Sequence, residues 1–240
     1  MPIKKSQGNM YPWVDATHSH LGGECQHKCS YCYVGSSRSG RAPRYCGDIR
    51  LLDNEFNVSY DKKTLERVCG KFPATIFIEH MNDLFEKDVP SEFIIKILDH
   101  CKKYPDNTYV LQTKNPARFQ EFLGDLPPNR ILGTTIESNR HYPNVMGNSP
   151  KPELRYDGML DLPLEERLFV TLEPILDFDV DVLAGWIVDI MPEFLNLGAD
   201  SKGNGLIEPT VEKIMELTDK LNKFGVELRE KHNLNRLKQK

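Results

Sequence analysis

Short apolar runs alternate with longer amphipathic stretches along this chain of 240 residues. The runs are rich in Ile, Val, Leu, Phe and Thr and are mostly apolar on both faces, which is typical of buried parallel strands. The expected strands are residues 74–79, 108–113, 130–136, 168–172 and 194–197, with an earlier strand within residues 14–21 and a last short one at residues 226–229.

Helical stretches separate the expected strands. Proline stands at a first-turn position in two of them, an acidic residue stands at an N-cap position in a third, and Gly225 follows the last as a C-cap would. Two further stretches, residues 35–60 and 142–164, show little periodicity and are predicted to be irregular. The expected helices are residues 61–69, 90–103, 116–123, 180–190 and 209–224.

This alternation predicts an α/β fold with a mostly parallel sheet. A closed eight-fold barrel takes about 250 residues, and about 50 residues of this chain come before the second strand. We therefore expect an open, partial (β/α)6 barrel of the TIM type, formed by a single domain of residues 1–240. In such folds the functional residues lie at the carboxyl ends of the strands.

Composition and charge narrow the functional classes. Apolar residues make up 39% of the chain, charged residues 28%, and the net charge is −4. This balance excludes a globally basic nucleic-acid coat protein but allows a local basic patch. No apolar run approaches the ~18 residues of a membrane span, and the N-terminus lacks the apolar segment of a signal peptide. We therefore predict a cytoplasmic protein with no membrane partner.

Three of the six cysteines crowd into eight residues, with the spacing C-x3-C-x2-C. Without an export signal, such crowding favours metal ligands or redox groups over disulfides. A structural zinc site needs a fourth ligand, and His27 and Cys46 are the candidates near in sequence. A zinc site is therefore possible but would be poorly formed. Three thiolates on a [4Fe–4S] cluster instead leave one iron open to bind a ligand. The crowded cysteines are Cys25, Cys29 and Cys32; Cys46, Cys69 and Cys101 are scattered.

The cysteine motif, with Tyr31 just before its third cysteine and a partial α/β barrel after it, resembles the radical S-adenosylmethionine (SAM) superfamily. The resemblance implies that the open iron binds the amino and carboxylate groups of S-adenosyl-L-methionine. Electron transfer from the reduced cluster then releases a 5′-deoxyadenosyl radical, which abstracts hydrogen from a substrate. The cofactor supplies this chemistry and the protein positions it. An external electron donor, flavodoxin-like or ferredoxin-like, is also implied.

Motifs at the ends of four strands extend the resemblance over roughly residues 11–230. They are similar to a phage-associated branch of the superfamily that has no defined activity and is itself similar to spore photoproduct lyase. The motifs occupy residues 78–90, 111–116, 132–137 and 169–174.

The resemblance implies roles for polar residues at the ends of the second and third strands. Asn82 and Asp83 stand where the superfamily holds the SAM amino group, often with a Gly-Gly-Glu sequence that is absent at this place. The alternative for this pair is an Asx turn that caps the next segment. Lys114 stands where a cation pairs with the SAM carboxylate, and the alternative is a surface lysine.

The next two strands end in carboxylates. Glu137 and Ser138, followed by Asn139, stand where ribose hydroxyls are held, and a carboxylate can accept hydrogen bonds from both hydroxyls. Glu173 ends an apolar run, where an unpaired acid is costly. Glu173 is therefore either a site residue or half of an ion pair with an arginine such as Arg167.

Aromatic and imidazole side chains surround the cysteine motif. By resemblance, Tyr31 packs near adenine, and Tyr33 is a candidate for a backbone contact. His18 and His20 alternate on one face of the first strand, where they either touch the substrate or the cluster or act as hydrogen-bonded wall residues.

The predicted cluster loop, about residues 22–50, carries four arginines and one acid among them, Asp48. Such a stripe suits phosphates and hence a nucleic-acid substrate, although a solvated loop is the alternative. The basic tail, about residues 229–240, is expected to fray. The favoured hypothesis is a radical SAM enzyme whose unidentified substrate includes a nucleobase among the candidates; the alternative is a non-enzymatic, zinc- or cluster-stabilised nucleic-acid-binding module. The arginines are Arg38, Arg41, Arg44 and Arg50.

Overall fold

The computed structural model describes residues 2–34 and 42–238. The chain divides into two compact units, which are described separately here. The first unit comprises Met1–Gln26, Cys32–Thr113 and Arg118–Ile131; the second comprises His27–Tyr31, Lys114–Ala117 and Leu132–Lys240.

Strands of the first unit lie in the order β1-β2-β5-β6. β1 runs antiparallel to β2, whereas β2, β5 and β6 are parallel. β3 and β4 form a separate antiparallel pair. The strands are β1 (Lys4–Lys5), β2 (Ala16–His18), β3 (Leu21–Gly22), β4 (Arg50–Leu51), β5 (Thr75–Ile78) and β6 (Thr108–Thr113); the helices are η2 (Ala42–Tyr45), η3 (Asp53–Asn57), α1 (Lys62–Cys69) and α2 (Ser91–Lys102), and η4 (Pro116–Phe122) follows β6.

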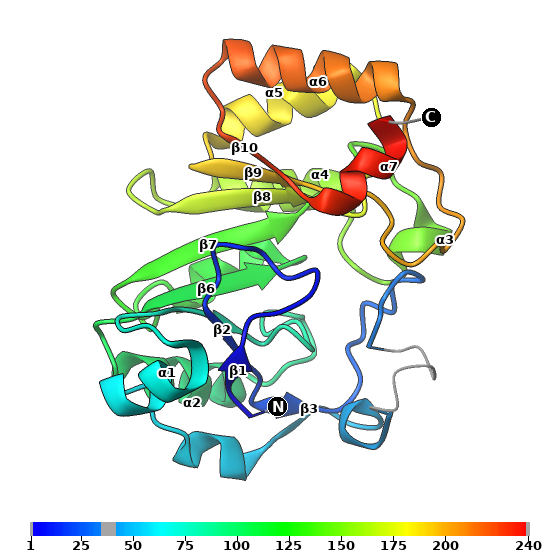
Figure 1. Ribbon diagram of the computed structural model, residues 1–240. Helices are drawn as coiled ribbons and strands as arrows, with labels where there is room; N and C mark the ends of the chain where they lie inside the picture. The colour runs from blue at the N-terminus through cyan, green and yellow to red at the C-terminus, as the bar shows by residue number, and fades with distance from the viewer. Residues whose placement is uncertain (1, 35–41, 239–240) are drawn as a thin grey trace. The chain divides into compact units, whose positions relative to one another are not determined.

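Strands of the second unit are parallel and follow the order of the chain, β7-β8-β9-β10. Helices α5 and α6 lie side by side (Figure 1), and α4 packs against α5. The strands are β7 (Arg130–Thr135), β8 (Leu168–Leu172), β9 (Phe194–Leu197) and β10 (Leu228–Glu230); the helices are α3 (Pro143–Met146), α4 (Pro152–Leu160), α5 (Val180–Ile190), α6 (Val211–Lys223), η5 (His232–Leu234) and α7 (Asn235–Lys238).

Local sequence explains where the helices begin and end. The Asp61 carboxylate accepts a hydrogen bond from the Thr64 amide at 2.8 Å and caps α1 at its N-terminus. Gly70 ends the same helix with a φ of +77°, a conformation that glycine adopts without strain. In α2, Ile94 and Ile97 are fully buried at helical spacing. The predicted α/β class with mostly parallel strands is confirmed.

The helix predicted at residues 116–123 is a 3-10 helix at residues 116–122, a geometry common in short connectors. The prediction for a second stretch was wrong. The stretch 142–164, predicted to be irregular, contains α3 and α4. The buried face of α4 holds Pro152, Arg155, Gly158 and Met159, so it presents no apolar stripe that a periodicity search would detect. Among the described residues, no helix is both long enough and apolar enough to cross a membrane.

Candidate active site

The cysteine motif carries three reduced thiols. Cys25, Cys29 and Cys32 are all half-buried and none of them forms a disulfide. Free thiolates are the ordinary ligands of an iron–sulfur cluster, so the donor chemistry of this set fits such a group. Across residues 2–34 and 42–238, no three His, Cys, Asp or Glu side chains are already arranged to hold a metal ion.

A turn of the second unit clasps the middle of the cysteine loop. The amide of Ser30 donates to the Val145 carbonyl at 2.9 Å, and the amide of Asn148 donates to the His27 carbonyl at 2.7 Å. Gly147, at a φ of +60°, approaches so closely that a Cβ there would lie 2.2 Å from the His27 carbonyl oxygen. The close approach therefore requires glycine at this position.

Cys29 itself is bonded to the same turn. Its thiol donates to the Met146 carbonyl at 3.4 Å. Burial raises the pKa of Cys29, while the positive charge of Lys114 acts in the opposite direction. The turn thus holds both the backbone and one thiol of the loop.

Glu137 is the centre of a polar group, the Glu137 network, which also contains Lys114, Arg155 and Tyr31. Glu137, two residues after the end of β7, and Arg155 are fully buried, whereas Lys114 and Tyr31 are half-buried. Its Oε1 accepts hydrogen bonds from Lys114 Nζ at 2.5 Å and from the Tyr31 hydroxyl. Its Oε2 accepts from Arg155 at 2.6 Å, and Lys114 also donates to the Tyr31 hydroxyl oxygen at 2.6 Å. Three residues singled out in the sequence are therefore in mutual contact.

The Glu137 network carries one net positive charge, since it has two cations and one carboxylate. Burial alone would raise the pKa of Glu137, but the charges of Arg155 and Lys114 outweigh it and lower that pKa to about 2. Burial and the nearby carboxylate raise the pKa of Tyr31 well above its usual value, so the phenol keeps its proton. A surplus positive charge next to a strand end suits an anionic group of a ligand.

Ser138 and Glu173 lie in other contacts of the second unit. The Ser138 hydroxyl donates to the Asp177 carbonyl at 2.6 Å. The Glu173 carboxylate accepts from Lys231 at 2.7 Å and from Asn233 at 3.0 Å. The ion pair expected for Glu173 is thus formed with a lysine, whereas Arg167 pairs with Glu193.

The remaining candidates for SAM binding belong to the first unit. The Tyr33 hydroxyl donates to the His80 carbonyl at 2.9 Å. The Asp83 carboxylate accepts from the Phe85 amide at 3.1 Å, which is the local turn considered as the alternative for this residue. Asn82 differs, because its buried Oδ1 atom has no hydrogen-bond partner. A buried orphan acceptor is costly unless a ligand or water supplies a donor.

His18 and His20 belong to a second buried polar group, the His18 network, which also contains Tyr60, Glu55 and Glu79. His18 bonds to the Tyr60 hydroxyl through Nδ1 at 2.6 Å and to Glu55 through Nε2 at 3.1 Å. His20 bonds to Tyr60 through Nε2 at 3.1 Å and to Glu79 through Nδ1 at 3.1 Å. Both imidazoles and the phenol are completely buried. The geometry supports the interpretation of the histidines as hydrogen-bonded wall residues.

Glu79 also holds the backbone that leads into the cysteine motif. Its carboxylate accepts from the amides of His20 and Leu21. Glu79 adopts a φ of +61°, which is uncommon for a residue with a side chain. Burial, followed by the charge of His20, lowers the pKa of His18 far below its usual value, so this imidazole is neutral.

Arginines of the predicted stripe bond within the protein. Arg44 forms an ion pair with Glu55 of the His18 network. Arg50 donates to the carbonyls of Arg44, Cys46 and Asp48, each at 3.1 Å. The other two members, Arg38 and Arg41, lie outside the described residues.

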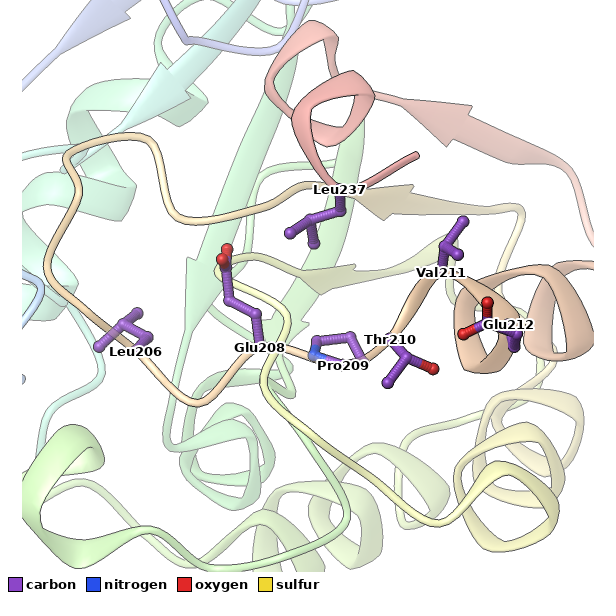
Figure 2. A pocket seen from close by; sticks show the side chains of 7 residues that line it. All are labelled: Leu206, Glu208, Pro209, Thr210, Val211, Glu212 and Leu237. Atoms are coloured by element: carbon purple, nitrogen blue, oxygen red, sulfur yellow. The ribbon is translucent and has the colours of Figure 1, made fainter. Parts of the chain in front are cut away.

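A surface pocket of about 410 Å³ lies at the N-terminal end of α6 (Figure 2). None of the candidate residues lines it, and Glu208 within it pairs with Arg236. The pocket is therefore separate in composition from the candidate site. Its lining residues are Leu206, Glu208, Pro209, Thr210, Val211, Glu212 and Leu237.

Sequence reasoning missed Arg155, the residue that neutralises one side of Glu137. It lay in the stretch predicted to be irregular, and no motif marked it. One signal was present, because Arg155 stands four residues before Met159 and three after Pro152, on the buried face of a helix. An arginine at a buried helical position needs an acid or several carbonyls as partners.

The fold is similar to that of solved structures of two enzymes. Spore photoproduct lyase complexed with dinucleoside spore photoproduct matches with a TM-score of 0.63 at 12% identity, over 93% of this chain and 78% of that one. SuiB of Streptococcus suis bound to its precursor peptide SuiA matches at 0.66 and 10%, over 95% and 51%. SuiB bound to S-adenosylmethionine matches at 0.62 and 10%, over 93% and 52%. This chain thus spans about half of SuiB, and the likeness confirms the α/β fold.

Sequence comparison gives a family directly. No curated protein matches the chain. A family model described as "Protein of unknown function (DUF5131)" matches residues 9–188, which is most of the chain. The protein therefore belongs to the DUF5131 family.

Proposed function

We propose that the chain is a radical SAM enzyme that cleaves S-adenosyl-L-methionine and uses the 5′-deoxyadenosyl radical to abstract hydrogen from a substrate. One observation carries this proposal. In the second unit, Cys29 of the C-x3-C-x2-C motif bonds to the Met146 carbonyl, and Tyr31, two residues later, belongs to the Glu137 network of two cations and one carboxylate. The fold likeness to a structure with bound S-adenosylmethionine supports it.

In this proposal Cys25, Cys29 and Cys32 hold a [4Fe–4S] cluster. When bound and reduced, the cluster supplies the electron that cleaves SAM. Lys114 pairs with the SAM carboxylate, because it belongs to a network in which two cations surround one carboxylate at a strand end. The orphan Oδ1 of Asn82 accepts a hydrogen bond from the SAM amino group.

Glu137 keeps room for a ribose hydroxyl. Three donors already bond to its carboxylate, and a carboxylate has about four acceptor sites. We assign Tyr31 to the adenine side of the site. We assign no direct SAM contact to Ser138, because its hydroxyl already donates to a backbone carbonyl. Glu173 takes a structural role, because Lys231 and Asn233 occupy its carboxylate.

Anaerobic reconstitution tests the core of this proposal. We expect about four irons per chain, a chromophore near 400 nm, and 5′-deoxyadenosine on addition of dithionite and SAM. A triple variant in which Cys25, Cys29 and Cys32 become alanine should lose all three signals. The matched control replaces the other three cysteines, Cys46, Cys69 and Cys101, and should keep them. A wild-type protein that holds iron and never cleaves SAM would contradict the proposal, and one zinc per chain would favour the binding-module alternative.

The substrate class and the electron donor are tested next. Nucleic acid comes first, because one similar structure holds a dinucleoside; a peptide comes second, because another holds a precursor peptide. The substrate should accelerate 5′-deoxyadenosine formation, and nucleic-acid binding should weaken as salt rises. A flavodoxin-like or ferredoxin-like protein should replace dithionite as the electron donor.

A further inference from the structure

Arg155 is the largest completely buried side chain among the described residues, and four of the five N–H groups of its guanidinium donate hydrogen bonds. Nε donates to the Pro150 carbonyl at 2.7 Å, and one terminal nitrogen donates to the Ser149 hydroxyl at 2.7 Å. The other terminal nitrogen donates to the Thr135 carbonyl at 2.9 Å and to Glu137 at 2.6 Å. The four acceptors lie on β7, in the turn after β7 and in the segment before α4.

One side of Arg155 leads to the cysteine loop. The Ser149 hydroxyl accepts from Arg155 and donates to the Met146 carbonyl at 2.7 Å. The same carbonyl accepts the thiol hydrogen of Cys29. A thiol that becomes a metal ligand loses its hydrogen, and the Met146 carbonyl then still has the Ser149 hydroxyl as a donor.

The other side of Arg155 leads to the proposed SAM carboxylate. Arg155 occupies Oε2 of Glu137, which leaves Oε1 to Lys114 and Tyr31. The orientation of the Lys114 ammonium group therefore depends on how Glu137 is held. Only a planar guanidinium with several fixed donors can hold Glu137 and Ser149 at the same time.

We propose that Arg155 is a positioning residue that couples the cysteine loop to the SAM-binding side of the site. It fixes Ser149 next to the carbonyl that Cys29 contacts, and it fixes Glu137 next to Lys114. The inference rests on the proposed function. It adds that one buried arginine, which touches neither metal nor SAM, controls both retention of the cluster and affinity for SAM, as outer-shell partners of metal ligands do.

Three variants separate the two sides. Arg155→Lys keeps the positive charge and removes the planar guanidinium that donates to several acceptors at once. The rate of iron loss to a chelator should therefore rise about 10-fold, and the affinity for SAM should fall about 10-fold. Ser149→Ala should raise only the rate of iron loss, and Glu137→Gln should lower only the affinity for SAM. Arg167→Lys, an exposed arginine paired with Glu193, is the control and should change neither measurement.

The SAM-induced change in the electron paramagnetic resonance signal of the reduced protein should also be smaller in Arg155→Lys. A variant that is only less stable, with normal iron loss, SAM affinity and signal, would give Arg155 a purely structural role and overturn the inference. A change in one of the first two measurements alone would overturn the coupling. If Arg155→Lys does not fold, Ser149→Ala tests the inference instead. A change in both the rate of iron loss and the affinity for SAM in Ser149→Ala would overturn the inference. Failure of the proposed function shows separately, as a wild-type protein without cluster or SAM binding.

Discussion

Each of the two units buries a polar group next to the carboxyl ends of its strands, and the two groups use different chemistry. The Glu137 network neutralises one carboxylate with two cations and a phenol. The His18 network joins two imidazoles through one phenol, with a carboxylate at each end. Charges held in the first arrangement are expensive to separate, whereas a neutral imidazole is sensitive to mild acid. We therefore expect mutation of the Glu137 network to cause the larger loss of stability, and we expect acidification to destabilise the His18 network at a higher pH.

Arg155→Met should give the largest loss of stability. The substitution leaves Glu137 buried with Lys114 as its remaining cation and removes the donor from three further acceptors. Breaking a buried pair by removing one partner typically costs about 3–5 kcal/mol, so the free energy of unfolding in urea should fall by about 4 kcal/mol. Arg167→Met, which removes an exposed pair, should cost less than about 1 kcal/mol. Equal losses in the two variants would remove the distinction between buried and exposed pairs.

Gly147→Ala extends the comparison from side chains to backbone. The added Cβ would lie 2.2 Å from the His27 carbonyl oxygen, and the φ of +60° is itself unfavourable for alanine. The expected loss is about 3 kcal/mol, at the upper end for strained backbone, and the displaced loop should also retain less iron. Gly70→Ala is the matched control, because Gly70 has a φ of +77° but no atom within 4 Å of the added Cβ. Similar iron retention in the two variants would argue against a clasp on the cysteine loop.

The sequence predicted the strands better than it predicted the site. Three strands, at residues 108–113, 168–172 and 194–197, match their expected bounds, because buried parallel strands are continuous apolar runs. α4 was missed because its buried face includes Arg155 and Gly158 instead of an apolar stripe. Lys114 and Glu137 were singled out because they stand at the ends of expected strands, within motifs that carry the resemblance to the radical SAM superfamily.

The partners of those residues were not accessible to the same reasoning. That Lys114, Tyr31 and Glu137 contact one another depends on how the cysteine loop folds back, and Gly147 sets that fold with a single close approach. Glu173 was expected to be either a site residue or half of an ion pair with an arginine, and it pairs with Lys231, more than fifty residues along the chain. Ion pairs between distant segments follow from tertiary packing, and no local pattern encodes them. The prediction of a single domain and the roles of the site residues stay predictions.

Tyr60→Phe tests the His18 network by removing its central group. The phenol bonds to both imidazoles, so its loss leaves His18 Nδ1 and His20 Nε2 buried without that partner. Because the phenol of Tyr60 is neutral, we expect a loss of about 1–2 kcal/mol in the free energy of unfolding, well below that of Arg155→Met. Tyr109→Phe removes one hydrogen bond, to the Tyr104 carbonyl at 2.9 Å, and should cost about half as much. A loss as large as that of Arg155→Met would mean that Tyr60 holds charge in place.

Mild acid should disturb the two networks in different pH ranges, although its effect is the smallest. Burial, and then the charge of His20, lower the pKa of His18, and they lower that of His100, whose ring contacts the ring of His20, to about 4. Below about pH 6.5, the unfolded chain therefore binds more protons than the native state. The free energy of unfolding consequently falls as the pH drops from about 6.5 towards 4.

Glu137 of the second unit follows the same rule in a lower pH range. The pKa of Glu137 is about 2 in the folded state, against an ordinary value of 4.5, so its contribution is complete above about pH 4.5 and is lost only below it. Between pH 6.5 and 5, hydrogen exchange corrected for its intrinsic rate should therefore accelerate in β2, which carries His18, and stay constant in β8. His100→Gln should flatten the response of β2, because it removes one of the groups that must take up a proton on unfolding. Equal acceleration of exchange in both strands would show that acid acts on the molecule as a whole. The His18 network would then not differ from the Glu137 network in its sensitivity to protonation.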